Sequence, residues 1–349
     1  MRNLRIHSSL VILLILLCAI GSYGGAIQTE RTSRSTEKQP DGHIDKEARF
    51  VRERLLLDFG WRFHLGDAAS IEGDFGFGSR ATFAKAGEAV GAAKPDFNDS
   101  SWRKVDLPHD WAVELEFVNM KDDDVKNHGF KPIGRRFPKT SIGWYRRAFA
   151  IPKTDEGKRL AVKFDGVFRD CNVWINGHYL GENLSGYSEF SYDISDYVKY
   201  GERNVLVVRV DASHYEGWFY EGAGIYRHTW LLKYSALHIP QYGTFVTTGV
   251  GENAARVNVE TKIFNQSESK AEYQLSSIIL DEKGNTVGST SSQLLGLNGQ
   301  EQETLLQQIT VRNPEIWSLE SPHLYTLVSL VESGNEVVDR VETTFGIRT

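Results

Sequence analysis

The expected fold class rests first on the stretch Val173-Trp174-Ile175-Asn176-Gly177. Bulky β-branched and aromatic residues in succession are typical of a strand, and Asn-Gly is the strongest short-range signal for a hairpin. Both Asn and Gly tolerate the positive φ that a type I′ turn requires at its two central residues. The stretch therefore predicts a β-strand that turns back tightly into an antiparallel partner.

Short apolar or alternating runs, bounded by Gly, Pro, Asp and Asn, lie on both sides of this hairpin, and we interpret them as further strands. In the first half of the chain the clearest runs are residues 159–164, 171–175, 204–210 and 229–232. In the second half they are residues 257–264, 271–280, 303–311 and 324–332. The second series has the spacing of an immunoglobulin-like sandwich, with residues 281–285 as a turn. The sequence thus predicts an all-β protein whose second half is an immunoglobulin-like sandwich.

Composition and charge limit the classes of partner. The 349 residues suffice for two ordinary domains. A content of 8 Trp, 14 Tyr, 18 Phe and 32 Gly against 2 Met favours strands and turns over helices. The formal net charge is -6, so no basic field is present to attract nucleic acid or an anionic membrane surface. We expect a neutral ligand and no nucleic-acid partner.

The first 26 residues have the pattern of a signal peptide. Arg2 and Arg5 precede an apolar run over residues 10–20, which is shorter than the roughly 20 apolar residues of a transmembrane helix. We expect cleavage, export to a secreted or periplasmic location, and a polar, disordered linker over residues 27–50. Attachment to the membrane through a lipidated Cys18 stays open as the alternative.

Two long segments without a strand pattern are expected to be loops. Residues 69–95 are rich in Gly and Ala, and we interpret them as a surface insertion that Phe75, Phe77 and Phe83 partly pin. Residues 117–141 hold an acidic cluster followed by two arginines. Loops of this length are commonly functional or disordered.

Seven different short motifs follow one another along the chain in a characteristic order and spacing. They are Leu107-Pro108-His109-Asp110-Trp111, Gly143-Trp144-Tyr145-Arg146-Arg147, Val173-Trp174-Ile175-Asn176-Gly177, Gly222-Ala223-Gly224-Ile225-Tyr226-Arg227, Pro314-Glu315-Ile316-Trp317-Ser318, Pro322-His323-Leu324-Tyr325 and Phe345-Gly346-Ile347-Arg348-Thr349. Together they resemble the N-terminal part of family 2 glycoside hydrolases. The resemblance covers nearly all of the chain from Arg54 onward.

This resemblance implies an order of domains. Residues 51–237 would form a galactose-binding-like jelly-roll β-sandwich, the sugar-binding domain of the family, and residues 238–349 an immunoglobulin-like β-sandwich. A TIM barrel with the two catalytic glutamates would follow, so the resemblance implies that this chain holds no catalytic residue. We therefore expect the N-terminal part of a β-galactosidase, inactive by itself, with a neutral carbohydrate substrate and the missing barrel as its partners.

Several alternatives stay open. β-Glucuronidases and β-mannosidases share the scaffold, so the chain could be a fragment of either. A freestanding carbohydrate-binding protein that uses the jelly roll alone is the alternative from the class of binding modules. We favour the galactosidase branch because His109-Asp110-Trp111 and the Gly-Ala-Gly-Ile-Tyr-Arg segment look most like it. A homo-oligomer is compatible with each of these interpretations.

Asp110 and Glu216 are the sugar-contacting residues that the resemblance implies. In related β-galactosidases a polar residue before the Trp of the first motif, and an acid shortly before Gly-Ile-Tyr-Arg, reach into the sugar site. The loop here is longer than in the best-known members, so Glu221 competes with Glu216. A carboxylate can accept two hydroxyl hydrogen bonds and so orient a neutral sugar. The alternative is that Asp110 caps its own turn, while His109 supports the loop.

Other conspicuous residues have plainer explanations. Core packing explains most of the large rings better than a sugar-stacking platform does, namely Trp61, Trp102, Trp144, Trp174 and Trp230. Arg146 and Arg227 could clamp a ligand, but such arginines usually make a structural ion pair or stack on a ring. The sequence has no phosphate loop, no paired Cys/His metal set and no nucleophile elbow, and Cys171 has no partner once the signal peptide is removed. We expect no cofactor, with a metal ion in the full-length enzyme left open.

Overall fold

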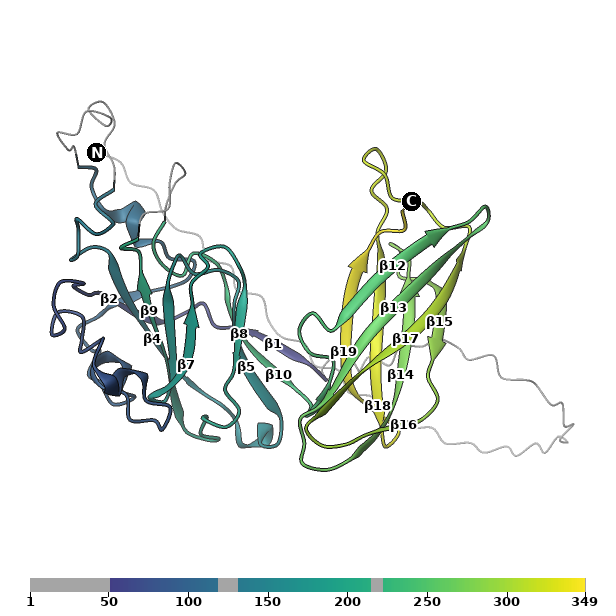
Figure 1. Cartoon of the computed structure of the whole chain (residues 1–349), viewed down its shortest axis with the longest axis horizontal. Helices are drawn as coiled ribbons and strands as arrows, with labels where there is room; N and C mark the ends of the chain where they lie inside the picture. Colours follow the sequence, from purple (N-terminus) through teal and green to yellow (C-terminus); the bar gives the residue numbers. More distant parts are fainter. Residues whose placement is uncertain (1–50, 119–130, 215–221, 349) are drawn as a thin grey trace, which may run out of the picture. The chain divides into compact units, whose positions relative to one another are not determined.

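The computed structural model describes residues 51–118, 131–214 and 222–348 of the chain (Figure 1). The predicted signal peptide, the linker, Glu216 and Glu221 lie outside these residues. No helix among the described residues has the length and apolar character needed to cross a membrane.

The first sandwich consists of two antiparallel sheets (Figure 1). The six-stranded sheet has the order β3 (Arg103–Val105), β2 (Trp61–Leu65), β4 (Ile142–Ala150), β9 (Arg203–Asp211), β6 (Cys171–Ile175) and β7 (His178–Asn183). The four-stranded sheet has the order β1 (Glu53–Leu56), β10 (Thr229–Tyr234), β5 (Arg159–Phe164) and β8 (Phe190–Asp193). Apolar side chains between the two sheets form one core, which includes Tyr145, Phe164, Val173 and Val208.

The predicted hairpin joins β6 to β7. Ile175 pairs with His178, and the two residues between them have the positive φ values that the turn requires, 50° at Asn176 and 83° at Gly177. The Asn176 side chain also acts as a strand partner, because its Oδ1 accepts a 2.9 Å hydrogen bond from the Val205 amide. The prediction is confirmed, and the turn is buried against β9 instead of projecting into water.

The central strands β4, β9 and β6 of the six-stranded sheet are buried on both faces along most of their length. Val205 and Val207 of β9 point into a second apolar cluster, whereas Leu206 and Val208 point into the core between the sheets. The insertion at 69–95 covers this second face, and its Ala92 and Ala93 are fully buried there. The sequence analysis predicted a surface loop that three Phe side chains partly pin, whereas the insertion packs closely on the sheet. A continuous apolar run requires cover on both faces, and the insertion provides the second cover.

The tryptophans belong mainly to these cores. Trp144 and Trp174 stack with ring centroids 5.6 Å apart under the insertion, and each indole N–H donates to a group of the insertion, Asp74 or Thr82. Trp61 and Trp102 are buried as well. Trp230 is half-buried, and the Arg54 guanidinium lies 3.7 Å from its ring centroid. Core packing is therefore confirmed for four of the five rings, and the fifth is covered by an arginine.

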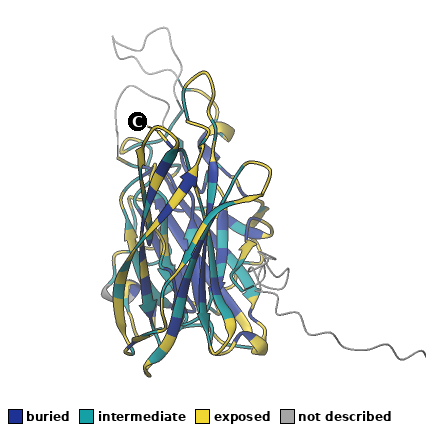
Figure 2. Ribbon diagram, turned by 90° about the vertical axis from the view of Figure 1, so that its right-hand side faces the viewer, coloured by how far each residue is buried: buried dark blue, intermediate teal, exposed yellow. Residues whose placement is uncertain are grey.

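The second sandwich also has two antiparallel sheets. In one sheet β13 (Ala254–Asn265) pairs with β11 (Leu237–His238), β12 (Thr244–Val250) and β17 (Glu301–Arg312). The other has the order β15 (Thr286–Ser291), β14 (Ala271–Leu280), β18 (Tyr325–Ser333) and β19 (Glu336–Phe345), with β16 (Leu295–Leu297) on β14. Buried and exposed residues alternate along β13, and Figure 2 shows such alternation along the strands. The all-β fold with two sandwiches is confirmed.

Candidate functional site

The motif around Asp110 and the motif around Gly224 lie against each other in the first sandwich. Amide N–H groups of the first motif donate to carbonyls of the second, from His109 to Ile225 at 2.8 Å and from Trp111 to Ala223 at 2.9 Å. Gly224 has a φ of 133°, and a Cβ there would lie 2.4 Å from the His109 carbonyl oxygen. Only glycine allows this approach. We call the joined segments 107–112 and 222–227 the Asp110 junction.

Asp110 is the side chain that holds the junction together. It is half-buried, and its Oδ1 accepts hydrogen bonds from the Ala112 and Ala223 amides, both at 2.9 Å. The first bond caps the short 3-10 helix η4 (Trp111–Glu114), so the capping role weighed for this residue is present. Its Oδ2 faces Gly222, because a Cβ on that glycine would lie 2.6 Å from this oxygen. Asp110 therefore lies beside Gly222, which follows residues 215–221 in the sequence.

The ring of His109 connects the junction to Tyr145 and Arg103. It is buried, with Nδ1 2.7 Å from the Tyr145 hydroxyl and Nε2 2.8 Å from Nη2 of Arg103. Nε2 also lies 3.2 Å from Oε1 of Glu114, so it has a donor on one side and an acceptor on the other, and the tautomer decides its role. Burial lowers the pKa of His109, against the opposing effect of the Glu114 carboxylate. These contacts support the predicted role of His109 in supporting the loop.

The two arginines that we weighed as ligand clamps differ from each other. Arg146 is buried, its Nε donates to Asp99 at 2.8 Å, and burial lowers its pKa. The expected structural ion pair is thus confirmed. Arg227 is exposed and makes no ion pair or ring contact within the described part of the chain. For Arg227 the expectation stays a prediction.

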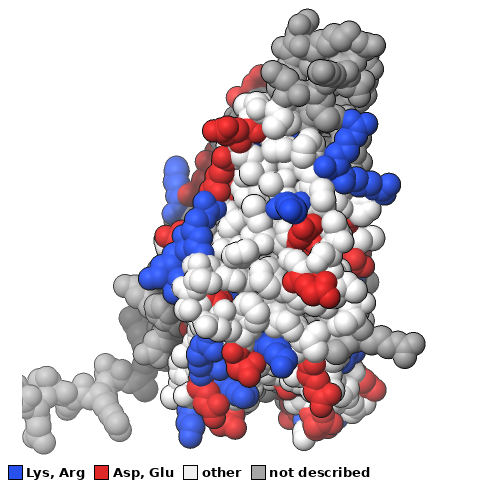
Figure 3. Space-filling model, turned by 90° about the vertical axis from the view of Figure 1, so that its left-hand side faces the viewer, with Lys and Arg blue, Asp and Glu red and all other residues white. Residues whose placement is uncertain are grey.

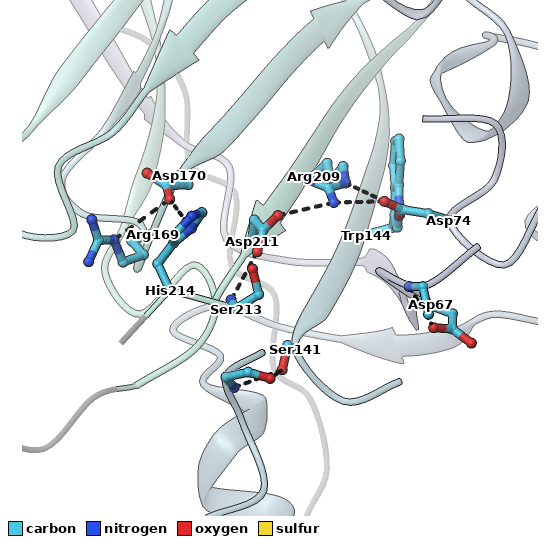
Figure 4. Close-up of polar contacts among 12 residues, drawn as sticks. Asp67, Asp74, Ser141, Trp144, Arg169, Asp170, Arg209, Asp211, Ser213 and His214 are labelled. Atoms are coloured by element: carbon cyan, nitrogen blue, oxygen red, sulfur yellow. Dashed lines mark hydrogen bonds and ion pairs between the residues drawn. The ribbon is translucent and has the colours of Figure 1, made fainter. Parts of the chain in front are cut away.

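A second polar cluster was missed by the sequence analysis. Arg209 of β9 donates from Nε and Nη2 to Oδ2 of Asp74, at 2.9 and 2.7 Å, and Nη2 lies 3.2 Å from Oδ2 of Asp211 (Figure 4). The sequence did contain a signal for this cluster, namely the charged Arg209 inside the apolar run of β9. A charge that is buried with such a run needs a partner of opposite charge. Within 51–118, 131–214 and 222–348, no group of three His, Cys, Asp or Glu side chains could hold a metal ion.

Comparison with known proteins identifies both halves of the described structure. The model of the glycosyl hydrolases family 2 sugar binding domain matches residues 93–235, and the model of glycosyl hydrolases family 2 matches residues 237–348. The β-galactosidase BoGH2A of Bacteroides ovatus is 39% identical over 300 residues, which are 85% of this chain and 32% of that protein. A β-glucuronidase of Formosa agariphila is 29% identical over 275 residues, which are 72% of this chain and 27% of that protein.

A solved structure gives the same result. The crystal structure of a family 2 glycosyl hydrolase from Bacteroides cellulosilyticus superimposes with a TM-score of 0.68 at 30% identity, covering 84% of this chain and 36% of that one. The chain thus spans about a third of the length of the relatives that it matches. Two family models in the expected order, close relatives in sequence and the shared sandwich folds agree, and the chain belongs to glycosyl hydrolases family 2.

Proposed function

We propose that this chain is the non-catalytic N-terminal portion of a β-glycosidase that hydrolyses terminal β-galactosides, and that the Asp110 junction shapes its sugar pocket. The contact of Asp110 with both motif segments supports the proposal, because Oδ1 accepts hydrogen bonds from both segments while Oδ2 faces Gly222, which follows residues 215–221 in the sequence. That segment holds Glu216 and Glu221, the other two candidate residues. A set of acidic side chains suits the hydroxyls of a neutral sugar.

A β-glucuronidase is the second candidate, because proteins with that name also match this chain. The two candidates differ in what they require of the site. A glucuronide carries a carboxylate, which proteins recognise with Arg or Lys, whereas a galactoside carries only hydroxyls. Arg103, beside the Asp110 junction, is already paired with Glu114 at 2.7 Å and contacts His109, so it does not favour the glucuronide. The exposed Arg227 within the junction is the cation that a glucuronide would need.

The full-length gene product, assayed with nitrophenyl β-galactoside, β-glucuronide and β-mannoside, tests this choice. We expect the highest kcat/KM with the galactoside. A preference for the glucuronide would replace the first proposal with the second. The 349-residue chain alone should turn over none of the three, because a retaining glycosidase needs two carboxyl groups about 5–5.5 Å apart around the glycosidic bond. Turnover by this chain would contradict its non-catalytic role.

Export is the second part of the proposal. The basic start and the short apolar run of the first 26 residues support cleavage by a signal peptidase. Mass spectrometry of the exported protein should find an N-terminus between about residues 19 and 27. A lipid on Cys18 would instead indicate membrane attachment, and a soluble cytoplasmic form that keeps Met1 would contradict export.

A further inference from the structure

A cavity of about 360 Å³ opens between the 68–77 turn of the insertion and the end of β9. Its walls combine hydroxyls and charged groups with apolar side chains, namely Ser70, Ile71, Phe77, Arg209, Asp211 and Ser213. Its volume lies at the small end of the range of about 300–1,000 Å³ that is typical of ligand pockets. None of these residues belongs to the Asp110 junction.

Arg209 supplies the positive charge in the wall of this cavity. The side chain is 4% exposed, and its guanidinium carbon lies 3.7 Å from the centroid of the Phe77 ring. Its bonds to Asp74 and Asp211 use Nε and Nη2 (Figure 4). None of these bonds uses Nη1, and Arg209 lines the cavity. A guanidinium nitrogen beside a cavity can donate to a molecule that occupies that space.

Asp211 supplies the matching acceptor. Its Oδ1 accepts from the Ser213 amide at 2.9 Å, and its Oδ2 lies 3.2 Å from Arg209. A carboxylate oxygen can accept more than one hydrogen bond, so Asp211 retains the capacity to accept from a ligand hydroxyl. Arg209 and Asp211 therefore place a donor and an acceptor side by side, as two neighbouring hydroxyls of a sugar require.

The balance of charge selects the class of ligand. Two carboxylates, Asp74 and Asp211, line the cavity against the one guanidinium of Arg209. A further anion would be repelled, and a metal ion would have to compete with a guanidinium that already bonds both carboxylates. Ile71, which is 57% exposed, adds an apolar surface that suits the C–H face of a pyranose. Figure 3 likewise shows both signs of charge interspersed on one face of the molecule, without a large basic area.

We propose that the Arg209 cavity is a second binding site for a neutral sugar residue. The inference rests on the proposed function for the class of ligand, and on the geometry of the cavity for its place. Because the cavity consists of residues of this chain alone, it binds its ligand in the absence of the barrel.

The 349-residue chain is titrated with methyl β-galactoside and, separately, with sodium glucuronate, and binding is followed by saturation-transfer NMR. Ala69 is exposed at the rim of the cavity, so Ala69→Trp should fill the space and weaken galactoside binding by at least about tenfold. Ala86→Trp, at an exposed position that does not line the cavity, is the matched control and should bind as the unmodified chain does. Ile71→Ala, which removes the apolar wall, is a second variant with the same direction of change.

Three results would overturn the proposal: no galactoside binding, equal binding by Ala69→Trp, Ile71→Ala and the control, or preferential binding of glucuronate. Circular dichroism of each variant shows whether it is folded. The test is separate from that of the proposed function, which measures hydrolysis by the full-length enzyme. If the full-length enzyme hydrolyses galactosides but the 349-residue chain does not bind methyl β-galactoside, only the proposed cavity site is refuted. If the chain binds methyl β-galactoside but the full-length enzyme prefers glucuronides, only the galactosidase proposal is refuted.

Discussion

Strands β9 and β13 bury their residues in two different ways. Every residue of β9 from Asn204 to Val210 is buried, whereas Ala255, Val257 and Val259 of β13 alternate with exposed or half-buried neighbours. The insertion at 69–95 causes the difference, because it places a second apolar cluster on the outer face of the first sandwich. The outer face of β13 stays in water. An unbroken apolar strand in an antiparallel sheet thus indicates that a distant part of the chain covers it.

The charged residues of β4, β9 and β13 follow the same difference. Arg146 and Arg209 lie in strands that are covered on both faces, and each is paired with a carboxylate, Asp99 or Asp74. Arg256 and Lys262 on β13 are exposed and need no such partner. Both the Asp110 junction and the Arg209 cavity are therefore found in the first sandwich, where loops and insertion cover the sheet.

The largest effect is expected from a substitution that disrupts the second apolar cluster. Trp144→Ala should lower the free energy of unfolding by about 3–5 kcal/mol, because it removes a large buried ring and leaves a cavity under the insertion. Phe245→Ala on β12 is the matched control in the second sandwich. Its ring is 60% exposed, so the change should stay within about 0.5 kcal/mol. Urea denaturation measures both, and equal losses would refute the contrast between the two sandwiches.

The next effect concerns function more than stability. Asp110→Ala in the full-length enzyme should lower kcat/KM by about one to two orders of magnitude, which corresponds to one lost charge-assisted contact of about 1.5–3 kcal/mol. Loss of the cap should also destabilise the protein by about 1 kcal/mol.

Asp281 offers a control for this change, because its Oδ1 likewise accepts backbone hydrogen bonds in a turn, from Lys283 and Asn285. Asp281→Ala should leave kcat/KM unchanged. A lower melting temperature for Asp110→Ala with an unaltered kcat/KM would assign Asp110 to capping alone, and the sugar contact would then have to come from Glu216 or Glu221.

The smallest effect is a dependence of stability on pH in both sandwiches. Burial lowers the pKa of His109 in the first and of His238 in the second, so both rings are held neutral in the folded chain. The unfolded chain takes up protons more readily, with a histidine pKa of about 6.5. The stability that each neutral ring contributes is therefore present above that pH and is lost as the pH falls below it.

Melting temperatures recorded between about pH 7.5 and pH 5.5 measure this loss. His109→Asn and His238→Asn should each flatten the curve. His109→Asn should have the larger effect on activity, because His109 belongs to the junction, whereas His238 lies in the second sandwich. A slope that neither variant changes would mean that other groups govern the acid sensitivity.

Local patterns predicted many of the strands closely. The runs at 159–164, 171–175 and 271–280 coincide with β5, β6 and β14, and the Asn-Gly turn has the expected backbone. Strand period and turn chemistry act over a few neighbouring residues, so a single sequence contains them. The predicted boundary between residues 237 and 238 and the candidate residues Glu216 and Glu221 remain predictions.

The pairing of buried groups depended on the tertiary structure. Asp74 and Arg209 are 135 positions apart, and Ala223 is 113 positions from Asp110, yet each pair is joined by hydrogen bonds. The sequence shows that a charge inside an apolar strand needs a partner, but any of its 46 acidic residues could supply it. Which one does so is decided only when the insertion packs on the six-stranded sheet, because this packing excludes the water that would otherwise solvate the charge.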